Sequence, residues 1–218
     1  MKILPAIIQF VQLTSMKYGI DESHGLSHSM NVLYYANQIY QSLVPTHSKL
    51  KAQEPVIFTS ALIHDMCDNK YIKQQTGLDK IQSFLKYKFS SHEISTIENI
   101  ITTMSYSKVK IDGFPDLGDY QIAYHIVREA DLLTAYDIDR SIIYHLNKSK
   151  NENMNVGDFE VSYQNARDLF DKRVLQHHNN NLFVTEYSKK KGAELHEQAL
   201  ERIKSWDFII NSYDKISF

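Results

Sequence analysis

The sequence predicts an all-α protein, and three observations support that prediction. The 218 residues include seven glycines and four prolines, too few for the many turns of an all-β fold. Most apolar residues recur at spacings of three and four, the period of a helix with one buried face. Hydrophobic residues make up 43% of the chain, enough for one compact core. We therefore expect a single compact helical bundle, with a core in residues 1–150 and a C-terminal helical extension in residues 151–218.

Charge and cysteine content exclude several classes of protein. The net charge is −2 with both signs interspersed, so no basic surface indicates a nucleic-acid polymer as partner. The single cysteine, Cys67, excludes an intramolecular disulfide and favours a reducing compartment. Gln9 and Gln12 interrupt the N-terminal apolar residues, and no segment has the roughly 18 apolar residues that a membrane span needs. We expect a soluble, cytoplasmic protein that does not bind membranes.

The helices of the first half of the chain are expected from apolar stripes and end signals. A helix at Pro5–Tyr18 would begin with a proline, which the first turn tolerates, and end at Gly19. A polar segment follows, in which Ser27 is a candidate N-cap for the helix that carries His28. Three further helices are expected: Pro55–Cys67, Leu78–Tyr87 and Glu93–Met104, the last capped by Ser91 together with Glu93.

The second half of the chain alternates in the same way between helical patterns and polar connections. A segment rich in glycine, proline and aspartate, Lys110–Gly118, is expected to be a loop. The expected helices after it are Tyr120–Tyr136, Ile138–Leu146, Phe159–His177 and Tyr187–Ser212. The asparagine-rich stretch Lys148–Val156 should be a loop, and the last two helices should be joined by a turn at residues 177–181.

Ionisable residues occupy positions on predicted apolar faces. His64 lies on the same helical stripe as Ile57, and Asp65 follows it directly. Burying an imidazole and a carboxylate costs several kcal/mol unless both are paired. For an isolated pair, a core histidine satisfied by its neighbours is the simpler explanation, although a divalent cation would pair with both groups at once. His28 and Asp131 occupy similar positions in two other expected helices, which strengthens the second explanation.

The order His … His-Asp … Asp resembles that of the HD-domain family of metal-dependent phosphohydrolases. Three segments, taken in order, resemble the motifs of a bacterial-type branch that hydrolyses nucleotides and related phosphate compounds. They are Asp21-x-Ser-His24-Gly-x-x-His28-x-x-x-Val32, Leu62-Ile-His64-Asp65-x-x-Asp68-x-Lys70, and Glu129-Ala-Asp131-x-Leu133 followed by Arg140. The tail Ala193–Arg202 is similar to the closing helix of that branch, so the resemblance covers nearly the whole chain.

The resemblance implies one divalent metal ion with four protein ligands: His28, His64, Asp65 and Asp131. Two imidazoles and two carboxylates suit Mn²⁺, Co²⁺, Ni²⁺, Fe²⁺ or Zn²⁺, and suit Mg²⁺ less well. It also implies that a metal-activated water hydrolyses a phosphate ester or anhydride of a small soluble substrate. A nucleotide is the substrate that the similar branch suggests.

The resemblance further implies four catalytic residues outside the metal ligands. Asp68 would orient or deprotonate the attacking water, whereas Lys70, Arg140 and His24 would meet phosphate charge. Structural alternatives stay open for each of them. Asp68 would then cap or end a helix, Lys70 would be a solvated surface lysine, Arg140 would pair with a nearby acid, and His24 would hold its loop by hydrogen bonds.

Two positions depart from the pattern of the family. Met104 stands where relatives often have a histidine, so one metal ion is expected rather than two. Thr134 stands where the similar branch commonly has an aspartate, which leaves the substrate preference open. Two other functions are kept as alternatives: cleavage of a cyclic nucleotide or another phosphodiester, and a non-catalytic regulatory module that binds metal or nucleotide. A homodimer through the C-terminal helices is also left open.

Overall fold

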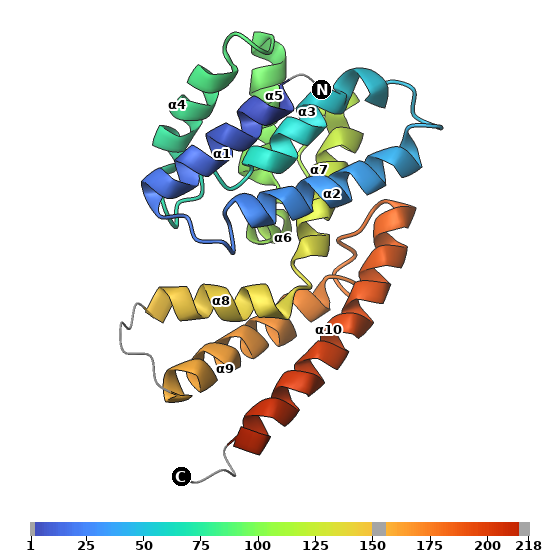
Figure 1. Ribbon diagram of the computed structural model, residues 1–218. Coiled ribbons are helices and arrows are strands. Elements are labelled where there is room, and N and C mark those ends of the chain that lie inside the picture. The colour runs from blue at the N-terminus through green and yellow to red at the C-terminus, as the bar shows by residue number, and fades with distance from the viewer. Residues whose placement is uncertain (1–2, 150–155, 214–218) are drawn as a thin grey trace. The chain divides into compact units, whose positions relative to one another are not determined.

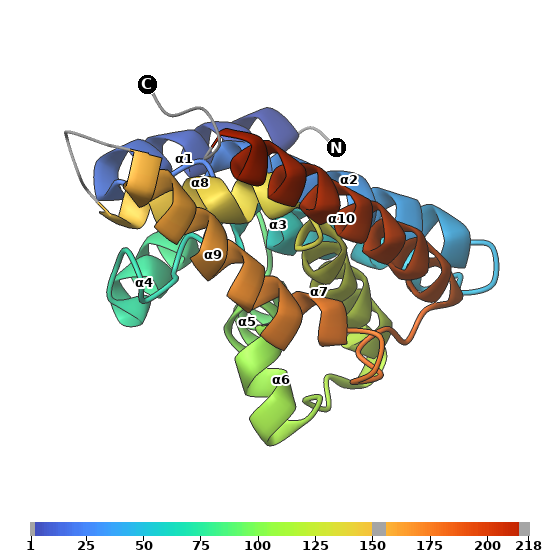
Figure 2. The ribbon, with the colours of Figure 1, turned by 90° about the horizontal axis from the view of Figure 1, so that it is seen from below.

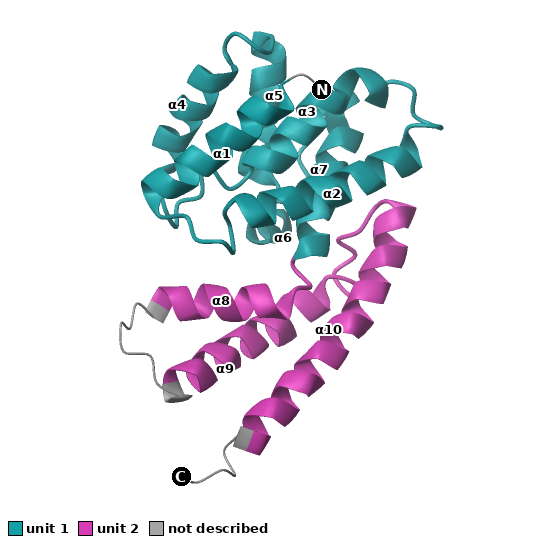
Figure 3. Ribbon diagram, in the orientation of Figure 1, with its two compact units in different colours: residues 1–134 teal, residues 135–218 magenta. Residues whose placement is uncertain are grey.

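The computed structural model describes residues 3–149 and 156–213, and every regular element in those ranges is a helix (Figure 1). The predicted all-α class is therefore confirmed. The chain divides into two compact units, with the boundary between Thr134 and Ala135 (Figure 3). This boundary falls before residue 150, which the sequence predicts as the end of the core. Among the described residues, no helix combines the length and apolar character needed to cross a bilayer.

Unit 1 is built around one buried helix. Its elements are α1 Leu4–Tyr18, α2 Leu26–Leu43, α3 Leu50–Ile63, α4 Gln74–Leu85, α5 Ser91–Thr103, α6 Tyr106–Asp112, a 3₁₀ turn Gly118–Tyr120, and α7 Gln121–Thr134. Helix α3 packs against α1, α2, α5 and α7 and lies among them in two perpendicular views (Figures 1 and 2). Helices α2 and α7 also pack against each other, so the ends of α2, α3 and α7 come close together.

The sequence of α3 explains its central place. Ile57, Leu62 and Ile63 are fully buried, and the polar Thr59 and Ser60 are buried with them. From Val56 to Ile63 every residue except Phe58 is buried, so this part of the helix needs no polar face, which accounts for its apolar run. Each of the three aliphatic side chains contributes about 2 kcal/mol through burial. Helix α3 is therefore a rigid support for the turn that begins at His64.

The boundaries of α3 differ from the prediction. The helix begins at Leu50, so Pro55 lies inside it, because buried Leu50 and Gln53 extend its buried face toward the N-terminus. It ends at Ile63, and His64 is its C-cap. The backbone tightens there into a turn, in which the Met66 N–H donates to the Ile63 carbonyl. The prediction that the helix continues to Cys67 was therefore wrong.

Helix α4 begins at Gln74 and not at the predicted Leu78, and three other local predictions in unit 1 were wrong. The N-cap of α2 is Gly25 and not Ser27. The N-cap of α5 is Ser90, which forms a reciprocal capping box with Glu93. Helix α6 occupies the start of the expected loop Lys110–Gly118, because Tyr106 and Val109 bury one face of a short helix that glycine ends at position 113. The expected helix Pro5–Tyr18 is confirmed by α1, and Gly19 follows it in the left-handed conformation with φ 63°.

Unit 2 contains α8 Ile138–Ser149, α9 Val156–Lys172, a 3₁₀ turn Val174–Gln176 and α10 Glu186–Tyr213. The predicted helices of this region are confirmed, although the first of the two long ones breaks after Lys172. The Arg167 guanidinium on α9 lies 2.9 Å from the Asp207 carboxylate on α10. The Trp206 indole N–H on α10 donates to Asp139 on α8 at 2.6 Å. Most of the expected loop Lys148–Val156 lies outside the described residues.

Gly77 is required where α4 meets the turn after α3. A Cβ atom there would lie 2.6 Å from the Cα of Cys67 and 2.9 Å from the Met66 carbonyl oxygen. Moving these backbone atoms away would strain the turn. Gly77→Ala should therefore lower the free energy of unfolding by about 1–3 kcal/mol, although alanine has the higher helix propensity. Urea unfolding of the purified variant measures this.

Gly192→Ala, within α10, is the matched control. The three atoms nearest to its Cβ would all belong to the Phe183 ring, the closest at 2.7 Å, and this side chain can shift. We expect a smaller loss of stability for this variant. Equal losses for the two glycines would contradict the close packing of α4 on the turn.

Candidate metal centre

The structure brings four of the predicted site residues together in unit 1. His28 lies in the first turn of α2, His64 caps the C-terminal end of α3, Asp65 follows in the turn, and Asp131 lies on α7. The mutual packing of α2, α3 and α7 places these side chains side by side. His28, His64 and Asp65 form a group that can hold a metal ion.

The distances between the candidate ligand atoms fit the coordination shell of a single ion. The two Nε2 atoms of His28 and His64 are 3.2 Å apart. Asp65 Oδ2 lies 3.4 Å from the first and 3.2 Å from the second. Asp131 Oδ1 lies 3.3 Å from His28 Nε2 and 3.7 Å from His64 Nε2. Two ligands that each lie about 2.1 Å from one ion are themselves roughly 3.0–3.5 Å apart, which is close to these separations.

A backbone hydrogen bond sets the tautomer of His64. Its Nδ1 atom lies 2.9 Å from the carbonyl oxygen of Ala61. A carbonyl can only accept, so Nδ1 carries the proton and donates it. In the neutral ring the lone pair is then on Nε2, the atom that faces the other candidate ligands. Metal-binding histidines are commonly oriented by such a bond from their second nitrogen.

One carboxylate oxygen in this group has no ordinary partner. Asp65 Oδ2 is buried and makes no hydrogen bond of normal geometry to any other described residue. Its neighbours are the imidazoles of His28, 2% exposed, and His64, 7% exposed. A buried carboxylate oxygen without a hydrogen bond is costly. A divalent cation would satisfy it, so the residues present fit such an ion.

Opposite charges dominate the ionisation of the group. Burial lowers the pKa of His64, but the carboxylates of Asp65 and Asp131 outweigh burial and raise that pKa to about 9. Burial raises the pKa of Asp65, but His64 and His28 outweigh it and hold the pKa well below its usual range. The pKa of Asp131 is lowered in the same way, mainly by His28 and His64 against the effect of burial. A metal ion needs neutral imidazole, so ion and proton compete for His64.

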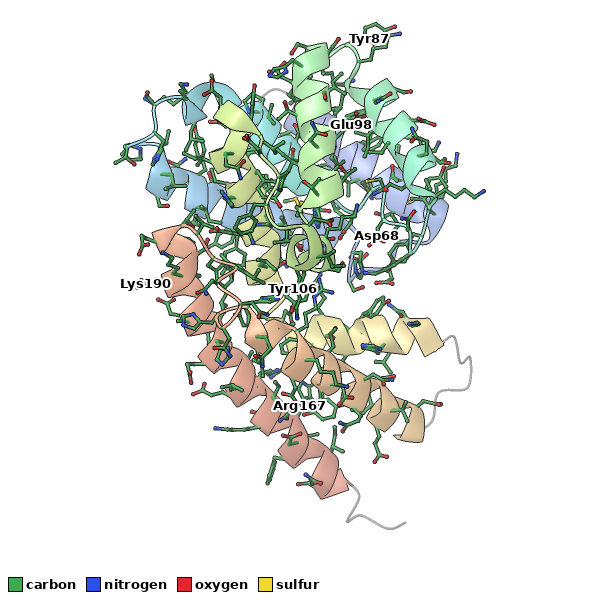
Figure 4. The ribbon with its side chains drawn as sticks, turned by 180° about the vertical axis from the view of Figure 1, so that it is seen from behind. Asp68, Tyr87, Glu98, Tyr106, Arg167 and Lys190 are labelled. Atoms are coloured by element: carbon green, nitrogen blue, oxygen red, sulfur yellow. The ribbon has the colours of Figure 1, made fainter. Side chains whose placement is uncertain are left out.

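Three of the four predicted catalytic residues lie in two loops next to the candidate ligands. Asp68 lies in the turn after α3 (Figure 4), where its Oδ1 accepts from the Lys70 backbone N–H at 2.9 Å. The Lys70 Nζ atom lies 3.0 Å from His24 Nε2 and 3.5 Å from Asp68 Oδ2. The His24 ring is an edge neighbour of the His28 ring, with centroids 6.3 Å apart. These contacts join the loop before α2 to the loop after α3.

Arg140, the fourth predicted catalytic residue, lies in unit 2. It is in the first turn of α8, where its backbone N–H donates to Asp137 Oδ1 at 3.1 Å. Through this bond the Arg140 backbone takes part in the N-terminal capping of α8. Its proposed contact with phosphate stays a prediction.

Two features of unit 1 were not predicted from the sequence. Tyr71 donates its hydroxyl proton to Asp21 at 2.8 Å and lies 3.1 Å from His24 Nδ1. On α7, the fully buried Glu129 lies 3.3 Å from the guanidinium of Arg128, which is itself 1% exposed. Tyr71 was given no role, because no local pattern in the sequence links it to Asp21 or His24. Glu129 was noted as part of the third motif, and no pattern in the sequence indicated its pairing with Arg128.

Comparisons with known proteins support the fold. No protein-family model and no curated protein matches the sequence. Among solved structures, Bacillus subtilis YpgQ is 20% identical, with a TM-score of 0.64 over 96% of each chain, and its selenomethionine form gives 0.65. A Lactobacillus plantarum structural genomics target is 18% identical, with a TM-score of 0.69 over 97% of this chain and 98% of its own. The chain thus shares its all-helical fold with these proteins along nearly its whole length.

Proposed function

We propose that this chain is a metal-dependent phosphohydrolase of the HD-domain type. It hydrolyses a phosphate ester or anhydride of a small soluble substrate in the cytoplasm, and a nucleotide is the substrate class we favour. The observation that supports this most strongly is the convergence of His28 on α2, His64 and Asp65 at the end of α3, and Asp131 on α7. Their ligand atoms lie 3.2–3.7 Å apart along the contacts described above.

The proposed cofactor is one divalent ion of the Mn²⁺, Co²⁺, Ni²⁺, Fe²⁺ or Zn²⁺ type, held by the four residues of the candidate metal centre. Two imidazoles and two carboxylates would leave coordination positions free for water. Such an ion lowers the pKa of bound water and polarises a phosphoryl oxygen. The burial of His28 and His64 keeps their imidazoles away from competing solvent.

The surrounding residues supply orientation and positive charge in this proposal. Asp68 uses Oδ1 to hold the turn, and a carboxylate has about four acceptor positions, so it can also accept a proton from the attacking water. Lys70 and His24 lie together beside the His28 ring and would meet the phosphate of a bound substrate. Arg140, which belongs to unit 2, stays a sequence-based proposal for phosphate contact.

Phosphate release from a panel of nucleotides tests the proposal. The panel contains mono-, di- and triphosphates and cyclic nucleotides, each with added Mn²⁺, Co²⁺, Ni²⁺ or Mg²⁺. We expect release of inorganic phosphate or pyrophosphate that requires the added metal and disappears after chelation. Asp119→Ala, which removes a surface carboxylate 71% exposed in the same unit, should retain activity.

The same panel separates the alternatives. Release from cyclic nucleotides alone would indicate a phosphodiesterase. No release from any compound, with one metal ion tightly bound, would contradict the phosphohydrolase proposal and favour a binding module.

A further inference from the structure

A second polar cluster lies beside the candidate metal centre. It joins the loop before α2 to the loop after α3, and both loops belong to unit 1. Asp21 is its centre. One carboxylate oxygen accepts from the Ser23 backbone N–H at 2.9 Å and from the Ser23 hydroxyl, and the other accepts from the Tyr71 hydroxyl at 2.8 Å. The two hydroxyl oxygens in turn lie 2.7 Å and 3.1 Å from His24 Nδ1.

These contacts determine which nitrogen of His24 carries a proton. Ser23 and Tyr71 each have one hydroxyl proton, and both protons are directed at Asp21. Toward His24, both oxygens can therefore act only as acceptors, so His24 Nδ1 must be protonated and donate.

The contact on the other side of the ring agrees with this assignment. The Lys70 ammonium lies 3.0 Å from His24 Nε2. An ammonium group only donates, so Nε2 must accept and carries the lone pair. His24 is thus in the Nδ1–H tautomer. Its Nδ1 faces the hydroxyl oxygens of Ser23 and Tyr71, which Asp21 holds in place, and its Nε2 faces the Lys70 ammonium.

The consequence concerns the position of Lys70. Its side chain is about half exposed (49%), and a free lysine side chain samples many rotamers. Here its Nζ is directed toward both His24 Nε2 and Asp68 Oδ2, at 3.0 Å and 3.5 Å. Because His24 contacts His28, this places a positive charge beside the candidate metal centre before any substrate arrives.

We propose that Asp21, Ser23 and Tyr71 are positioning residues, which fix the tautomer of His24 so that its Nε2 holds the Lys70 ammonium ready to bind a phosphate group. The choice of phosphate as the ligand rests on the proposed phosphohydrolase function. The tautomer of His24 rests on the hydrogen bonds alone. A purely structural role, in which the cluster only joins the two loops, predicts no effect on the tautomer or on phosphate affinity.

The first test reads the tautomer in the metal-free protein. With ¹⁵N-labelled histidine, NMR should show His24 protonated at Nδ1 and unprotonated at Nε2. The double variant Ser23→Ala/Tyr71→Phe removes both acceptors of the Nδ1 proton and should shift His24 toward the Nε2–H tautomer. Tyr71→Phe alone, the milder change, should shift it partly. An unchanged His24 spectrum in the double variant would overturn the proposal.

The second test measures phosphate binding and kinetics. Calorimetry with inorganic phosphate, on protein loaded with Mn²⁺, should show about tenfold weaker binding in the double variant, as expected for a lost hydrogen bond in a charged network. KM should rise by a similar factor while kcat changes less than about twofold, because the loss concerns binding of the ground state and the transition state alike. Equal phosphate affinity in wild type and double variant, or no phosphate binding by the wild type, would overturn the proposal.

Tyr40→Phe is the matched control. Its hydroxyl also donates to a carboxylate of unit 1, that of Glu54 at 3.1 Å, and it should change neither the His24 spectrum nor phosphate affinity. The two proposals fail separately. A wild type that binds phosphate through a locked His24 but hydrolyses nothing refutes only the phosphohydrolase, whereas hydrolysis with unchanged KM in the double variant refutes only the positioning role.

Discussion

Replacement of Asp65 by alanine is expected to abolish metal retention and hydrolysis while leaving helical content nearly unchanged. Asp65 lies in the turn after α3 and contributes no regular helical hydrogen bond. Its buried Oδ2 lies within 3.4 Å of both candidate imidazole ligands. Loss of a residue that merely orients a ligand already weakens metal binding about 10–100-fold, so loss of a direct ligand should cost more than about 100-fold.

Calorimetric titration with Mn²⁺ measures this effect, and circular dichroism checks the fold. Asp119→Ala, which removes an exposed carboxylate, is the control and should bind the ion as the wild type does. An Asp65→Ala protein that keeps its full metal content would contradict the assignment of Asp65 as a ligand.

Replacement of Arg128 by methionine is expected to lower the free energy of unfolding by about 3–5 kcal/mol, because it leaves a buried charge uncompensated. Glu129 is fully buried, and its Oε1 lies 3.3 Å from the Arg128 guanidinium. That guanidinium also lies 4.6 Å from the centre of the Phe114 ring, which adds a cation–π contact. Urea unfolding at neutral pH measures the loss.

Lys49→Met is the matched control for this prediction. Lys49 and Asp119 form an ion pair at 2.7 Å, but both side chains are 71% exposed, so the pair should contribute less than about 1 kcal/mol. The double variant Arg128→Met/Glu129→Gln should recover part of the stability that Arg128→Met loses, since it removes the uncompensated charge. A loss below about 1 kcal/mol in Arg128→Met would show that the buried pair is not required.

The helices could be predicted because most of them bury one face, and periodic burial leaves a pattern in the sequence. Helix α1 was predicted almost to the residue, since its apolar stripe ends at a glycine that can adopt the left-handed conformation. Helix α6 was missed because seven residues between a serine and a glycine are too few to show a period. The start of α3 was missed because Pro55 was taken as the first residue of the helix. The structure begins the helix at the buried Leu50, five residues earlier.

The four candidate ligands could be proposed from sequence because each is a polar group in an apolar setting. Their geometry could not, because it depends on where α3 ends. Periodicity placed His64 on a helical stripe, whereas the structure places it at the C-cap, where the Ala61 carbonyl orients its ring. The bond between Asp21 and Tyr71 joins residues 50 positions apart, and no local pattern indicates such a contact.

The most direct test of the metal centre counts the ions and their nitrogen ligands. Wild-type protein would be titrated with Mn²⁺ and studied by pulsed electron paramagnetic resonance, which detects coordinated imidazole nitrogen. We predict one ion per chain with two imidazole ligands, and one imidazole in His28→Ala if that variant still binds the ion. Binding well below one ion per chain, or a two-imidazole signal that persists in His28→Ala, would contradict the proposed metal centre.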